Sequence, residues 1–233
     1  MATFTALVVL IACAAVEGAS SAAEQQILKA GNAIPAVLNK QWTDALTTQR
    51  KQVADLQAAV VKGQSTEVNA AITKAFGQLG TWLAKSNSLA DALKTRQGQE
   101  VTNLVNRYAK VLRTLQTSPA AAVANENQVV QLRKDKIALL TNWENHVIEI
   151  NAEYRRGYLN AFQAATKQAA AAKPEIRKAI RAAFVRLLGA AVKGQEQNIA
   201  LLTTKQFPLI ENFALLGGQI LIELVVAGQG AQI

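Results

Sequence analysis

Residues 137–162 read IALLTNWENHVIEINAEYRRGYLNAF, and their large apolar side chains recur at the spacing of an α-helix. Steps of three and four residues connect the members of this row: Ile137, Leu140, Trp143, Val147, Ile150, Tyr154, Tyr158 and Phe162. Residues at this spacing lie on one face of a helix, whereas a strand would alternate apolar and polar residues. The stretch therefore predicts a long amphipathic helix that packs against other helices.

The same steps of three and four continue on both sides of this stretch, through residues 68–83, 101–115 and 176–191. Hydrophobic residues make up 50% of the chain but aromatic residues only 5%, so the core must consist mainly of Ala, Leu, Val and Ile. Such a composition favours helices over sheets. We predict an all-α fold, namely a single-domain antiparallel bundle of about five to seven amphipathic helices, some long, with a very apolar C-terminal helix.

Prolines, glycines and capping residues indicate where these helices begin and end. The expected helices span 22–33, 35–62, 66–85, 88–117, 122–172, 174–205 and 208–228. Each of the four prolines can sit in the first turn of a helix, where its missing N–H costs no hydrogen bond. We expect Gly63 to end one helix and Ser65 or Thr66 to cap the next.

The N-terminal residues, MATFTALVVLIACAAVEGAS, have the features of a secretory signal peptide. Their apolar run is too short to span a bilayer, which needs about 20 residues, and small residues precede Ala19. We therefore predict a signal peptide at residues 1–18, a helical domain at residues 19–233, and secretion into the extracellular space. Cleavage would remove Cys13, the only cysteine, and leave a mature chain without disulfides.

The sequence contains no pattern typical of a catalytic or metal-binding site. Its single histidine, His146, lies near Glu149 and Glu153, but one histidine cannot supply the two Glu-x-x-His pairs of a dinuclear carboxylate site. A Gly-x-Ser-x-Gly nucleophile elbow and a phosphate-binding loop are also absent from the sequence. We expect no catalytic residues, no metal ligands, no cofactor and no enzyme activity.

The formal net charge is +9, and several cations gather after residue 166. Lys173, Arg177 and Arg181 follow one another at four-residue steps, with Lys178 between them. A cationic edge beside an apolar row is typical of helices on anionic membranes, and also of solvated bundle helices. We take these four residues as candidates for contact with an anionic membrane surface, an acidic protein or a glycan. Nucleic acid is disfavoured, because no aromatic residues interleave with the charges.

Residues 207–228, FPLIENFALLGGQILIELVVAG, form the most apolar stretch outside the N-terminus. They are long enough to span a bilayer, but Glu211 and Glu223 are costly there and no basic flank follows. Three interpretations stay open: the central, buried helix of a bundle, which we favour, a segment that inserts into lipid, and a permanent span. The candidates for contact with an apolar ligand or a membrane are Leu209, Ile210, Phe213, Leu216, Ile220, Leu221, Leu224 and Val225.

A helical bundle without disulfides can open without breaking covalent bonds. In this organisation the chain is similar to the exchangeable apolipoproteins, although its basic charge differs from theirs, and the resemblance implies helices that open toward lipid. We predict a secreted, non-enzymatic protein that binds lipid or another apolar ligand, as a carrier or at a lipid surface. One alternative is a secreted interaction or effector protein whose basic helical face meets an acidic partner. The other is a membrane-disrupting or pore-forming helical protein.

Overall fold

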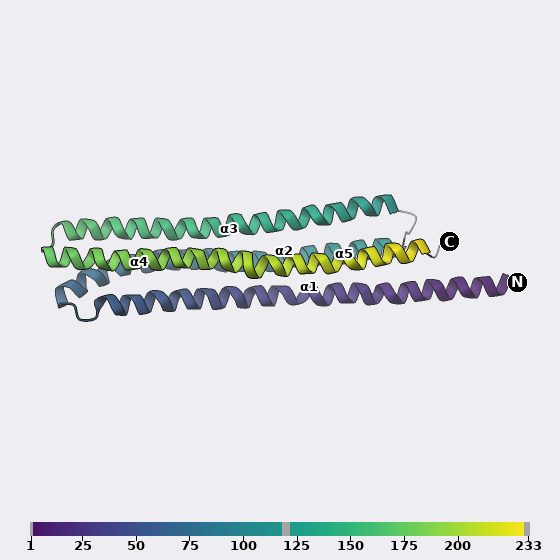
Figure 1. Ribbon diagram of the computed structural model, residues 1–233, viewed down its shortest axis with the longest axis horizontal. Helices are drawn as coiled ribbons and strands as arrows, with labels where there is room; N and C mark the ends of the chain where they lie inside the picture. Colours follow the sequence, from purple (N-terminus) through teal and green to yellow (C-terminus); the bar gives the residue numbers. More distant parts are fainter. Residues whose placement is uncertain (1, 118–121, 231–233) are drawn as a thin grey trace. The chain divides into compact units, whose positions relative to one another are not determined.

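The computed structural model describes the backbone of residues 2–117 and 122–230, and side chains between residues 22 and 226 except at 75, 78–83, 116–126 and 168. These residues form five α-helices and one π-helical segment, which Figure 1 shows in chain order: α1 (Ala2–Val61), α2 (Thr66–Thr117), α3 (Ala122–Ala170), α4 (Pro174–Leu201), η2 (Leu202–Gln206) and α5 (Phe207–Gly230). The described backbone contains no strand. The predicted all-α class is confirmed, and so is a long apolar helix near the C-terminus.

Helix α1 continues through Pro35, where the sequence led us to expect a boundary. A proline inside a helix lacks the N–H that would bond to the carbonyl four residues earlier, so a local penalty is expected. Gly98 of α2 lies beside the proline in unit 1, and an added Cβ there would sit 3.7 Å from the Cβ of Pro35, an ordinary van der Waals distance. Pro35 therefore lies inside a continuous helix, on the side that faces α2.

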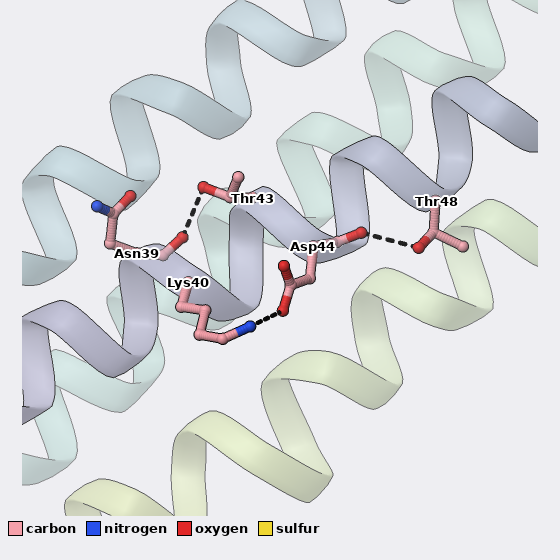
Figure 2. Close-up of polar contacts among 5 residues, drawn as sticks. All are labelled: Asn39, Lys40, Thr43, Asp44 and Thr48. Carbon is pink, nitrogen blue, oxygen red and sulfur yellow. Dashed lines mark hydrogen bonds and ion pairs between the residues drawn. The ribbon is translucent and has the colours of Figure 1, made fainter.

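Beyond the proline, α1 is supported by side-chain contacts one helical turn apart, which Figure 2 shows. Lys40 Nζ lies 2.7 Å from Asp44 Oδ2. Thr43 Oγ1 donates to the carbonyl of Asn39, and Thr48 Oγ1 to that of Asp44, both at 2.8 Å. Charge pairs at this spacing stabilise a helix by about 0.2–0.5 kcal/mol each. These contacts therefore stabilise the part of α1 that follows the proline.

Helix α2 likewise runs through residues 86–88, the site of a second expected boundary. Ser88 was expected to cap a new helix, but its Oγ donates to the carbonyl of Ala84 at 3.1 Å. A serine hydroxyl can either cap a helix or bond back to the preceding turn. The back-bond removes the signal for a break, and the expected boundary is wrong.

Other expected boundaries are confirmed. Gly63, between α1 and α2, has φ of +76°, a conformation that L side chains rarely adopt. Ser65 caps α2, because its Oγ accepts a hydrogen bond from the N–H of Val68 at 3.3 Å. Pro174 occupies the first turn of α4. All three signals act over one turn of backbone, which explains why the sequence was sufficient to predict them.

Helices α4 and α5 are joined by the π-helical segment η2, where the sequence predicted an interruption between residues 205 and 208. Pro208 cannot donate a backbone hydrogen bond, and a wider π turn is one way in which a helix accommodates such a residue. Gln206 at the end of η2 is fully buried and accepts a hydrogen bond from Gln97 Nε2 of α2 at 2.9 Å. Pro208 therefore alters the helix without ending it.

The helices contribute to two compact units. Unit 1 contains the described residues up to Leu38, Arg96–Asn142 and those from Gln206 onward. Unit 2 contains Asn39–Thr95 and Trp143–Lys205. The signal peptide at residues 1–18 and a single domain at residues 19–233 stay predictions.

In unit 1, an aromatic contact joins α2 to α5. The rings of Tyr108 and Phe213 meet edge to face, with centroids 5.2 Å apart. A Cβ at Gly217 would overlap the Tyr108 ring, so the close approach of α5 to α2 requires a glycine at this position. Lys136 of α3 binds Glu211 of α5 with an Nζ–Oε2 distance of 2.8 Å. Helix α5 thus contacts both α2 and α3.

In unit 2, the core combines fully buried tryptophans with a polar network. Trp42 and Trp143 are 0% exposed. A chain of buried hydrogen bonds links α1, α3 and α4: Tyr154 OH to Gln49 Oε1 at 3.1 Å, Gln49 Nε2 to Asn198 Oδ1 at 2.7 Å, and Asn198 Nδ2 to Asn151 Oδ1 at 3.1 Å. Buried polar groups are stabilising only when they are paired, so this network specifies how the three helices align.

The buried tyrosines predict a loss of stability at alkaline pH. Burial raises the pKa of Tyr154 to about 12, and burial together with the charge of Glu211 raises that of Tyr108 to about 12, against an ordinary 10.0. In the unfolded chain these tyrosines lose their phenol protons at lower pH than in the folded chain. Their contribution to the free energy of unfolding is therefore complete below pH 10 and is lost between pH 10 and about 12. In circular dichroism melts, Tm should fall over this range, and less steeply in the Tyr108→Phe/Tyr154→Phe variant. Equal slopes would contradict the prediction.

Candidate apolar binding groove between α3 and α4

Helices α3 and α4 pack in unit 2 through aromatic side chains. The rings of Phe162 and Phe184 meet edge to face with centroids 5.9 Å apart. The hydroxyl of Tyr158 donates to the carbonyl of Leu187 at 2.6 Å. Burial raises the pKa of Tyr158 far above its ordinary value, so the phenol stays neutral. These contacts join the two helices through aromatic side chains.

A groove of about 340 Å³ lies beside this junction, and we call it the α3–α4 groove. Its volume falls in the range of small-molecule sites, about 300–1,000 Å³. The lining residues are mostly apolar: Arg155, Tyr158, Leu159, Phe162, Phe184, Val185, Leu188, Ala191, Val192 and Gln195. Several of them are unusually exposed for their type, with Val185 at 71%, Leu188 at 55% and Leu159 at 54%. The groove therefore presents apolar surface that the folded chain does not cover.

Two polar side chains of the groove already have hydrogen-bond partners within the chain. Tyr158 is bonded to the backbone, and Gln195 Nε2 donates to the carbonyl of Asn151 at 3.1 Å. The lining contains no carboxylate, thiol or imidazole. The arrangement can hold an apolar molecule, and the ionised group in its lining is the guanidinium of Arg155.

A smaller space of about 200 Å³, which we call the cationic pocket, adjoins the groove. Phe162 and Phe184 line both spaces, so the two meet at this ring pair. Arg177 and Arg181 line the cationic pocket. Within the described part of the chain, the buried Nε of Arg177 has no hydrogen-bond partner, although its Nη2 donates to the carbonyl of Ala172 at 3.1 Å. A buried donor without an acceptor is costly, and an anionic ligand would satisfy it.

The structure separates the four predicted cations. Arg177 and Arg181 line the pocket together, whereas Lys178 is exposed and lines neither space. Lys173 lies just before the first residue of α4 and forms an ion pair with Glu67 of α2 at 3.6 Å. The expected cationic row therefore ends at Arg177, because Lys173 lies outside the helix.

The predicted apolar candidates of α5 fall into three groups. Ile210, Phe213, Ile220 and Leu221 are buried in unit 1, Leu209, Leu216 and Leu224 are partly exposed, and Val225 is exposed. A different row faces outward: Leu215, Ile222 and Val226, at 62%, 65% and 62% exposure. Helix α5 was expected to be buried on nearly every side, and this expectation is wrong, since only one face is buried.

Among the described residues, one helical stretch, Pro174–Val226, is long and apolar enough to cross a bilayer. The buried share of its apolar window is 28%. A central helix of a soluble core is typically mostly buried, and this stretch is only partly buried. Length and composition fit a soluble helix or a membrane-associated one.

Other places in the described chain offer less to a ligand. No group of three His, Cys, Asp or Glu residues that could hold a metal occurs there. A third space of about 310 Å³ lies between α1 and α4, with Asp44, Thr48 and Thr204 in its lining. Asp44 is paired with Lys40, and both threonine hydroxyls donate to backbone carbonyls of their own helices. These three polar groups are satisfied, whereas the buried Oε1 of Gln41, also in the lining, has no partner among the described residues.

The sequence reasoning missed the groove because it followed one apolar row per helix. Val185, Leu188 and Val192 form a second row on α4, at steps of three and four, beside the row that begins at Ile176. Leu159 and Phe162 form a matching pair on α3. Two neighbouring apolar rows on one helix are the signal that could have revealed the site.

Fold and site together define an all-α protein with an apolar interhelical groove and an adjoining cationic pocket. A scan against protein-family models found no match, and neither did searches of the curated proteins and of the solved structures.

Proposed function

We propose that this protein is a secreted, non-enzymatic helical protein that binds lipid or another apolar ligand. The observation that carries the proposal is the α3–α4 groove, whose apolar lining is open to solvent at Leu159, Val185 and Leu188. Covering such side chains contributes about 25 cal/mol for each Å² of apolar surface removed from water. Secretion rests on the signal-peptide pattern of residues 1–18.

We also infer that the helices form antiparallel bundles. In unit 1, Glu24 of α1 pairs with Arg113 of α2, and Gly31, one to two turns later, lies against Val105. As the residue number rises in α1, it falls in α2, which supports an antiparallel pair. In unit 2, the contacts of α3 with α4 follow the same rule, from Asn151 with Asn198 to Tyr158 with Leu187.

The groove itself is tested by Val185→Asp. A carboxylate in the apolar lining should weaken the binding of an uncharged apolar dye such as Nile red by at least about tenfold, since burying a valine contributes about 1.5–3 kcal/mol. Dye fluorescence titrations with purified protein measure the affinity. Because Val185 is 71% exposed, Tm should not change appreciably.

Ile199→Asp is the matched control, since Ile199 is also on α4 and 50% exposed but does not line the groove. It should bind the dye as the unmodified protein does. If both variants lose binding equally, or if the unmodified protein binds no dye, the groove is not the site.

A second candidate is membrane insertion by α5. The observation in its favour is the exposed row Leu215, Ile222 and Val226, which lies opposite the buried face of the helix. An apolar row open to solvent is what a lipid-binding helix presents. This candidate predicts that lipid association depends on α5 and not on the α3–α4 groove, and the first experiment of the Discussion separates the two.

A further inference from the structure

We propose that the α3–α4 groove binds a monoacyl lipid with a carboxylate headgroup, the acyl chain lying in the groove and the carboxylate at Arg177 and Arg181. The inference rests on the proposed function and adds the chemical class of the ligand. It follows from the shape of the two spaces, the charge of one of them and an unpartnered nitrogen.

The two spaces adjoin along α3 and α4, with Arg177 and Arg181 in the cationic pocket and Arg155 in the lining of the groove. Phe162 and Phe184 line both spaces, so a chain that fills them must pass over this ring pair. Along α4 the site extends from Arg177 to Gln195, about 27 Å of helix at 1.5 Å per residue. A long, flexible chain fits such a shape, whereas a compact apolar molecule would occupy the groove alone.

The cationic end has an unsatisfied donor. Arg177 Nε is buried and lacks an acceptor among the described residues, and no ion pair is found for Arg177 or Arg181 within that part of the chain. A carboxylate carries two acceptor oxygens, and its charge-assisted hydrogen bonds to guanidinium groups are about twice as strong as neutral ones. The ligand class that satisfies this site is therefore an anionic headgroup on an apolar chain.

The geometry favours a single lipid molecule over a membrane surface. Lys178 and Arg186 are exposed cations of α4 that a bilayer surface would attract, and they line neither space. Arg177 and Arg181 instead share a pocket with apolar side chains such as Ile180 and Phe184. Charge and apolar surface converge within one site, as expected for a ligand that carries both.

The test compares oleate with its methyl ester, an uncharged molecule with the same chain. Equilibrium dialysis with full-length protein should show oleate binding about tenfold more tightly than methyl oleate, the size of effect typical of a charge-assisted hydrogen bond. Arg177→Gln/Arg181→Gln should remove this preference and leave methyl oleate binding unchanged. The control Lys178→Gln/Arg186→Gln loses the same charge outside the pocket and should keep the preference.

Each outcome decides a separate question. If neither ligand binds, the proposed function of the groove fails. If oleate and methyl oleate bind equally to the unmodified protein, the groove remains the binding site and the carboxylate assignment is overturned. A preference for oleate that persists in the pocket variant, or vesicles of anionic phospholipid bound in place of monomeric oleate, would also overturn it. If the double variant proves unstable in thermal melts, Arg181→Gln alone, at an exposed position, should still lower the preference for oleate.

Discussion

Replacing Leu221 with aspartate is expected to unfold the protein in buffer. Leu221 is 3% exposed in unit 1, on the buried face of α5. Removing a buried leucine costs about 2–5 kcal/mol, and an unpaired buried carboxylate adds several more. The sum is comparable to the whole stability of a typical domain, about 5–15 kcal/mol. Circular dichroism melts measure the effect, and a cooperative transition near the unmodified Tm would contradict it.

The adjacent substitution, Ile222→Asp, is the matched control and also tests membrane insertion. Ile222 is 65% exposed, so the charge remains in water and Tm should change little. If the row Leu215, Ile222 and Val226 inserts into lipid, this variant should fold normally and no longer float with vesicles. If lipid association depends on the α3–α4 groove, the variant should bind lipid as the unmodified protein does. The two neighbouring residues thus separate the core role of α5 from a membrane role.

Replacing Asn198 with leucine should have the second largest effect, although the change makes the core more apolar. Asn198 is 1% exposed, accepts from Gln49 Nε2 and donates to Asn151 Oδ1. Without Asn198, the buried Gln49 Nε2 and Asn151 Oδ1 lose this hydrogen-bond partner. Each loss lowers the stability of the fold by about 1–3 kcal/mol. The Nε2 of Gln49 keeps only a longer contact to the carbonyl of Gly194, at 3.4 Å. We expect a decrease of about 2–5 kcal/mol in the free energy of unfolding, measured by urea titration.

Asn145→Leu is the control for this experiment, because Asn145 is exposed on α3 in the same unit. The same chemical change there should leave the free energy of unfolding within about 0.5 kcal/mol of the original value. If Asn198→Leu proves as stable as the unmodified protein, the buried network does not hold α1, α3 and α4 in alignment.

Local chemistry accounts for the features that were predictable from the sequence. The three- and four-residue steps of 137–162 specify a helix, because they place apolar side chains on one face whatever the partner is. Gly63 and Ser65 define a turn and a cap through their own backbone and hydroxyl groups. Arg177 and Arg181 were recognised as candidates for anion contact, since four-residue spacing aligns them on any helix.

The failures occurred where a local signal is compatible with more than one structure. Pro35 was expected to begin a helix, but α1 is continuous through it. Ser88 could cap or bond back, and nothing in the nearby sequence decides between the two. Lys173 was aligned with the cationic row by spacing alone, and its ion pair with Glu67 comes from a residue more than a hundred positions away.

The sequence by itself determined that the chain is helical, where several helices end, and which residues carry the charge. Only the tertiary structure decided which apolar rows are covered. Residues 207–228 are apolar on almost every side, and their composition does not show that Leu221 is buried while Ile222 is exposed. The groove has the same origin, since Val185 and Leu188 lie on a face of α4 that no other helix of the described chain covers. Burial is a property of pairs of surfaces, whereas a helical period belongs to one segment alone.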